Sequence, residues 1–111
     1  MNNLITKPFT YVKTLSRDHN ISAGVHFFYN FEGEEDFNYD LLKELYGSRI
    51  FHFSEHDTSA GGSRETRKIL NIFEVTCIPS FYFVVHNKAY KYFGPWDKDT
   101  IERLYERLEQ D

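Results

Sequence analysis

The sequence predicts a single α/β domain over residues 1–111, with a mixed sheet of about four strands and helices on both faces. Short runs rich in aromatic and β-branched residues alternate along the chain with amphipathic stretches at helical spacing. The chain has the length of one domain, and its 41% hydrophobic and 18% aromatic residues are enough for a sizeable core. A globular protein is therefore expected.

The first expected element is a helix near the N-terminus. Pro8 suits a first helical turn, and Phe9, Val12 and Leu15 follow at near-helical spacing. The first strand is expected over residues 24–29, because this run consists mainly of aromatic and β-branched residues. Together these segments predict that a helix precedes the first strand of the sheet.

A second helix is expected over residues 37–46. Phe37 and the leucines of this segment fall on one face, and Gly47 follows as a typical C-terminal cap. Residues 50–54 then read as the second strand. Because a helix joins these two strands, they should run parallel with a right-handed connection.

The second half of the chain predicts a helix, a hairpin and a final helix. Residues 64–73 have helical spacing, and Pro79 precedes a strand over 80–85. A tight turn at 86–88 leads to an antiparallel strand over 89–93. The last helix carries a continuous apolar stripe, formed by Ile101, Leu104, Tyr105 and Leu108. The expected order is therefore α-β-α-β-α-β-β-α.

Charge and cysteine content narrow the function classes. The formal net charge is −4, which argues against a nucleic-acid partner. Cys77 is the only cysteine, so an internal disulfide is impossible and an oxidising compartment is not required. The N-terminus lacks a signal-like apolar region, and no apolar run is long enough for a membrane helix. We expect a cytoplasmic protein with no membrane partner, no cofactor, and a monomeric or homodimeric state.

One stretch resembles a known family. Residues 73–83 read Phe-Glu-Val-Thr-Cys-Ile-Pro-Ser-Phe-Tyr-Phe. They are similar to the thioredoxin segment that runs from an aromatic through Val-x-x-Ile-Pro-Thr into an apolar strand. The turn at 86–88 and Gly94 resemble that family's Asn-Gly turn and the glycine before its last helix. The resemblance covers roughly residues 25–108, and it implies a thioredoxin-like fold with a cis Ile78–Pro79 bond.

The sequence departs from thioredoxins at the redox motif. Where that family has Trp-Cys-Gly-Pro-Cys, this chain has Phe31, Glu32, Gly33, Glu34 and Glu35. Thiol–disulfide exchange needs a thiolate and a resolving thiol, so dithiol oxidoreductase activity is not expected. The carboxylates have two main interpretations. They stabilise the N-terminus of the following helix, or they form an acidic patch for a basic partner. A carboxylate pair for hydrolysis is a weaker alternative.

Two functional hypotheses follow. The first is a non-catalytic thioredoxin-like domain that binds a protein or peptide, through the cis-proline loop and the acidic loop. Its site would comprise Phe31, Glu32, Gly33, Glu34, Glu35, Cys77, Ile78 and Pro79. The alternative is a single-cysteine thiol enzyme or redox sensor, in which Cys77 exchanges with an external thiol. Against this alternative, we expect Cys77 to be buried, as free cysteines commonly are, and no Lys or Arg is adjacent to Cys77 in sequence.

The histidines do not predict a metal site. His52 and His56 have the i, i+4 spacing of a helical zinc motif, but His52 is expected in a strand and His56 in a loop. His26 lies in the middle of an expected strand among aromatic residues. We therefore interpret His26 as a hydrogen-bonded residue of the core or sheet face.

Overall fold

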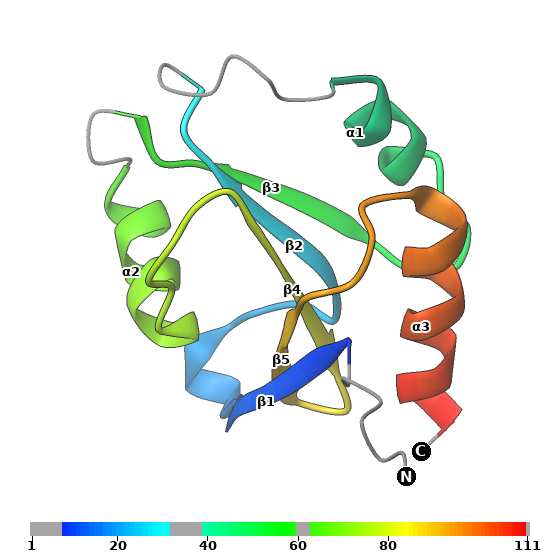
Figure 1. Cartoon of the computed structure of the whole chain (residues 1–111). Coiled ribbons are helices and arrows are strands. Elements are labelled where there is room, and N and C mark those ends of the chain that lie inside the picture. Colours follow the sequence, from blue (N-terminus) through cyan, green and yellow to red (C-terminus); the bar gives the residue numbers. More distant parts are fainter. Residues whose placement is uncertain (1–7, 32–38, 60–62, 111) are drawn as a thin grey trace, which may run out of the picture.

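The computed structural model describes residues 8–31, 39–59 and 63–110, which form one five-stranded mixed sheet and three α-helices (Figure 1). The elements in chain order are β1 (Phe9–Thr14), a short 3-10 helix (Arg17–His19), β2 (Gly24–Tyr29), α1 (Tyr39–Tyr46), β3 (Phe53–Asp57), α2 (Arg64–Phe73), β4 (Ser80–Val85), β5 (Lys88–Tyr92) and α3 (Lys98–Gln110). The expected α/β class is confirmed, with one strand more than the sequence predicted.

The strands lie in the order β1-β5-β4-β2-β3. As expected, β2 and β3 are parallel and joined through α1, and β4 and β5 form an antiparallel hairpin. The hairpin turn places His86 and Asn87 at positive φ, a geometry typical of type I′ turns. β2 also pairs antiparallel with β4. It is therefore flanked by β3 on one side and β4 on the other, and all of its residues are buried.

The expected N-terminal helix is wrong, because residues 9–14 form strand β1 at one edge of the sheet. Its register against β5 is interrupted by a bulge between Tyr11 and Lys13. The bulge adds one residue to the strand, so Phe9 packs on one face of the sheet while Val12 and Leu15 pack on the other. This extra residue explains how a strand carries apolar residues at three-residue spacing.

The second predicted strand is displaced along the chain. We expected it over residues 50–54, but β3 begins at Phe53. Phe51 is buried, and Ile50 packs against the same core from the connection that precedes the strand. Burial of these two side chains needs no strand pairing, so an apolar run alone does not locate the start of β3.

The helices cover both faces of the sheet, as expected. Figure 1 shows α1 and α3 on one side and α2 on the other. The larger core cluster joins α1 and α3 to one face of the sheet, and Leu45 and Ile101 are fully buried within it. The smaller cluster lies under α2, where Phe73 packs against Phe28 and Tyr82. Each sheet face therefore has its own apolar core.

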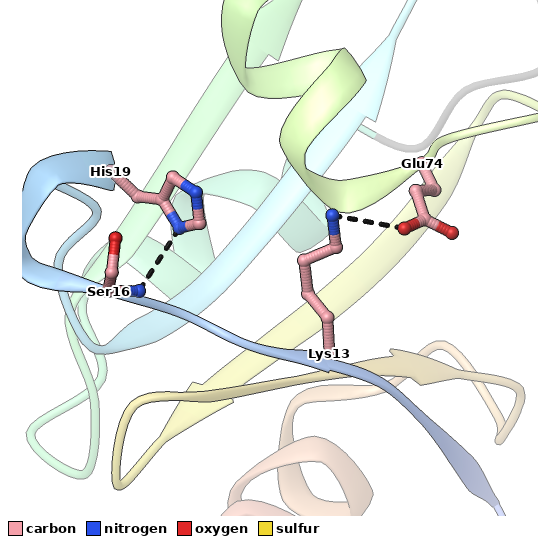
Figure 2. Close-up of polar contacts among 4 residues, drawn as sticks. All are labelled: Lys13, Ser16, His19 and Glu74. Carbon is pink, nitrogen blue, oxygen red and sulfur yellow. Dashed lines mark hydrogen bonds and ion pairs between the residues drawn. The ribbon is translucent and has the colours of Figure 1, made fainter.

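Polar contacts join the N-terminal strand to its surroundings (Figure 2). The Lys13 ammonium of β1 lies 3.0 Å from a carboxylate oxygen of Glu74, the residue that follows α2. The backbone N–H of Ser16 donates to Nδ1 of His19, 3.1 Å away, as the chain enters the 3-10 helix. The ion pair connects β1 to the end of α2, on the side of the sheet that carries the smaller core.

Among the described residues, no helix is long and apolar enough to span a membrane.

Candidate functional site

The loop between α2 and β4 contains three of the expected site residues, Cys77, Ile78 and Pro79. α2 ends at Phe73, and Glu74 follows in the left-handed conformation with φ 57°. The N–H of Val75 then donates to the Leu70 carbonyl at 3.0 Å, which holds the start of the loop against the helix. The Ile78–Pro79 bond at its far end is cis, as expected. The loop is thus held against α2 at its start and leads directly into β4.

An open pocket of about 190 Å³ lies beside this loop. Its lining comes from three segments of the chain and consists of Thr58, Leu70, Val75, Thr76, Cys77 and Ile78. Typical small-molecule sites are larger, about 300–1,000 Å³. This pocket is therefore of a size for a single side chain rather than for a complete cofactor.

Cys77 is exposed, so the interpretation of this residue as buried is wrong. The Lys91 ammonium of β5 donates a hydrogen bond to the Cys77 sulfur over 3.3 Å. The same ammonium lies 5.2 Å from the centre of the Phe93 ring. Sequence proximity could not reveal this contact, because Cys77 and Lys91 meet only when β4 and β5 pair. The loop therefore presents an accessible thiol beside a positive charge.

Tyr82 lies on the same side of the sheet as the thiol. Burial raises the pKa of its hydroxyl, and the nearby Cys77 and Glu74 raise it further. At neutral pH this side chain is a neutral phenol. It therefore carries no negative charge that would compete with the Cys77 sulfur for the Lys91 ammonium.

Phe31 marks the other part of the expected site. Its side chain is exposed, and its ring contacts the ring of Tyr39 at 6.3 Å between centroids. Its N–H donates to a carboxylate oxygen of Asp57 at 3.2 Å, which ties the end of β2 to the end of β3. The other residues of the expected acidic loop lie outside the described residues: Glu32, Gly33, Glu34 and Glu35. Their position relative to Pro79 stays a prediction.

The histidines form a structural pair. His26 is buried as expected, and its Nδ1 lies 3.0 Å from Nε2 of His56. A neutral His26 donates through Nε2 to the Ser22 carbonyl at 2.9 Å and accepts from His56. Burial lowers the pKa of His26, and burial together with His26 lowers that of His56 to about 4. Within the described ranges, no cluster of three or more His, Cys, Asp or Glu residues could hold a metal ion.

The chain's only tryptophan lies in the connection between β5 and α3. The Trp96 indole packs edge-on against Phe27 and Phe81, with centroid separations of 5.7 and 5.0 Å. It is nevertheless 44% exposed. Phe81 follows Pro79 by two positions, so this ring lies close to the base of the loop.

Comparison with known proteins identified no relative of this chain. No protein-family model matches the chain, and neither the curated proteins nor the solved structures give a significant match. Function is therefore inferred from the geometry of the loop, the pocket and the thiol.

Proposed function

We propose that this protein is a non-catalytic, thioredoxin-like domain that binds an extended segment of a protein partner at the loop of residues 75–79. The observation that carries the proposal is the open, largely apolar pocket beside an exposed Ile78. An apolar side chain of the partner would enter the pocket, while the partner backbone lies along Ile78.

Several features support the thioredoxin-like part of the proposal. The parallel β2–β3 pair, the antiparallel β4–β5 hairpin and the cis Ile78–Pro79 bond are features that the family resemblance implies. In this proposal, which here follows the sequence alone, Phe31 and the acidic residues Glu32, Glu34 and Glu35 contribute contacts to basic side chains of the partner. The strand β1 lies outside the stretch that the resemblance covers.

Peptide selection tests the binding proposal directly. A random peptide library is selected on the immobilised protein, and recovered peptides are titrated by fluorescence anisotropy. Ile78→Ser should weaken binding by about tenfold or more, since exposed apolar anchors dominate such interfaces. Tyr11→Ser is the matched control, because Tyr11 is similarly exposed but lies on β1. Equal affinity of the selected peptides for the wild type and Ile78→Ser would contradict the proposal, as would a selection that recovers none.

A second candidate function is favoured by the contact between Cys77 and Lys91. In this alternative, the Cys77 thiolate attacks oxidised glutathione, forms a mixed disulfide with one half and releases the other half as reduced glutathione. The Lys91 ammonium at 3.3 Å donates a hydrogen bond to the sulfur that reacts. Reduced glutathione in excess would reverse the step, which makes Cys77 a sensor of the thiol pool.

The rate of mixed-disulfide formation, followed by intact-protein mass spectrometry, tests this alternative. Lys91→Met should react at least about fivefold more slowly, since a hydrogen bond to a charged group of roughly 1 kcal/mol is lost. Lys88→Met is the control, because Lys88 lies on the same strand but pairs with Val85 rather than facing Cys77. A wild-type rate no faster than that of a small unstructured thiol peptide would argue against a redox role.

A further inference from the structure

The outer edge of β3 is open in the part of the chain that the structure describes. β3 is the last strand of the sheet and pairs only with β2 there, and Figure 1 shows it at the margin of the sheet. Val25 N–H donates to the His52 carbonyl, and Thr58 N–H donates to the Tyr29 carbonyl. In a strand, neighbouring residues direct their backbone groups to opposite sides. The N–H and carbonyl groups of the intervening residues Phe53, Glu55 and Asp57 therefore point outward.

The two edges of the sheet differ in regularity. β1 at the opposite edge contains a bulge between Tyr11 and Lys13, a feature that discourages pairing with another strand. β3 keeps an unbroken register with β2 over its whole length, and its sequence Phe-Ser-Glu-His-Asp contains no proline, glycine or lysine. The geometry of β3 is therefore suited to accept a further strand.

The charge along this edge selects the partner. Glu55 and Asp57 alternate with Ser54 and His56, so the two carboxylates share one face of the edge. The Glu55 carboxylate accepts hydrogen bonds from the Tyr29 and Tyr46 hydroxyls at 2.6 and 2.5 Å. These contacts hold one negative charge in place on the edge.

Asp57 is fixed in a similar way. Its carboxylate accepts hydrogen bonds from the N–H groups of Ser59 and Phe31 at 2.9 and 3.2 Å. Hydrogen bonds to Ser59 lower the pKa of Asp57, so it is ionised at neutral pH. The edge thus combines outward backbone groups with two oriented carboxylates.

We propose that the β3 edge binds an extended basic segment of a partner protein, which adds to the sheet as an antiparallel strand with Lys or Arg at every second position. Basic side chains on one face of the added strand lie opposite Glu55 and Asp57. A second copy of this chain is a poor occupant, because pairing about a two-fold axis at Glu55 sets like charges opposite each other. This surface is separate from the loop of residues 75–79 and goes beyond the function proposed there.

The test uses a synthetic peptide in which lysine alternates with valine and threonine, and a control peptide with glutamate in place of lysine. Binding to the full chain is followed by amide NMR shifts and amide hydrogen exchange. The lysine peptide should protect the amides of Phe53, Glu55 and Asp57 and leave those of Cys77 and Ile78 unchanged. The glutamate peptide should not bind.

Two variants at one position isolate the outward backbone donor. Glu55→Pro removes an N–H that points away from β2, so the bonds between β2 and β3 remain. Glu55→Ala removes the same carboxylate but keeps the N–H. The proline variant should bind the lysine peptide about tenfold more weakly than the alanine variant, because it loses a backbone hydrogen bond and adds a bulky ring at the edge.

A charge variant provides a second readout that does not depend on the proline. Glu55→Gln combined with Asp57→Asn keeps oxygen acceptors for the tyrosine hydroxyls and for the Phe31 and Ser59 N–H groups. This double variant should weaken binding and reduce its salt dependence. Three results would overturn the proposal: equal binding by the Glu55→Pro and Glu55→Ala variants, unchanged affinity of the double variant, or protection of β1 amides instead of β3 amides. Failure of the loop variants described above would leave these results intact, so the two proposals are separable.

Discussion

Gly24 occupies the first position of β2 with φ +139°, a backbone conformation that side chains strongly disfavour. A Cβ atom at this position would overlap with the His52 carbonyl oxygen, which accepts the hydrogen bond of Val25. The close approach of the two backbones therefore depends on the absence of a side chain.

Gly24→Ala should lower the free energy of unfolding by at least about 2 kcal/mol, because backbone strain and overlap add. Gly47→Ala is the control, since a Cβ there lies at ordinary contact distance, 3.4 Å, from the Glu44 carbonyl oxygen. Urea denaturation of both variants measures the effect. A loss in Gly24→Ala no greater than in Gly47→Ala would contradict the geometry at His52.

The His26–His56 pair should make stability depend on pH. Both pKa values are lowered in the folded state, that of His56 from 6.5 to about 4. Below pH 6.5 the unfolded chain therefore binds more protons than the folded chain, and the free energy of unfolding falls as the pH decreases toward about 4.

Urea denaturation at a series of pH values between about 7 and 5 measures this slope, above the range in which most carboxylates titrate. His56→Gln should flatten the slope, because the coupled pair is removed. The exposed His86, changed to Gln, is the control, because it does not contribute to the pKa of either His26 or His56. A wild-type slope unchanged by His56→Gln would show that the pair does not govern acid stability.

Among the helices, α3 has the clearest agreement between sequence pattern and packing. Its four predicted apolar positions are all buried, and Tyr105 contacts the rings of Phe51 and Phe83. The helical period of the apolar residues was sufficient to predict the buried face of α3, because this face packs against one continuous core.

Leu104→Ala should cost about 2–5 kcal/mol, the range for a buried leucine truncated in a packed core. Leu104 is only 6% exposed, so water cannot replace most of the contacts that its side chain loses on truncation. Glu106→Ala on the exposed side of the same helix is the control. A loss below about 0.5 kcal/mol for Leu104→Ala in denaturant melts would place this face outside the core.

The N-terminal strand and β3 show where the pattern was insufficient. Residues 9–14 contain mainly aromatic and β-branched residues, which favour a strand, but the spacing of Phe9, Val12 and Leu15 suggested a helix. A bulge depends on how the strand pairs with its neighbour, so the sequence of the strand alone does not reveal it. Similarly, the buried Phe51 made the chain before β3 look like part of the strand.

The candidate site was predictable only in part. Local similarity predicted the position of the loop and its cis proline, because both belong to one short continuous stretch of sequence. The exposure of Cys77, its contact with Lys91 and the pairing of His26 with His56 depend on which strands become neighbours. Such contacts link residues distant in sequence, and a single sequence without strand registers does not specify them.

The 111-residue chain should show no disulfide reductase activity. The dithiol mechanism of disulfide reduction needs a second cysteine in the same chain to resolve the mixed disulfide, and this chain contains one cysteine. Insulin reduction with dithiothreitol as electron donor should proceed at the rate of dithiothreitol alone. A Cys77→Ser variant provides the baseline, and acceleration by the wild type above that baseline would contradict this expectation.

The position of Trp96 gives the protein an internal optical probe. Because the chain contains a single tryptophan, its emission reports one place, the contact of the indole with Phe27 and Phe81. Unfolding removes these neighbours and exposes the indole fully to water, which shifts emission to longer wavelength. Phe81 lies two positions after Pro79, so occupation of the loop should also change the intensity. Chain unfolding can thus be followed without an attached dye, and a change in emission on adding a peptide would report occupation of the loop.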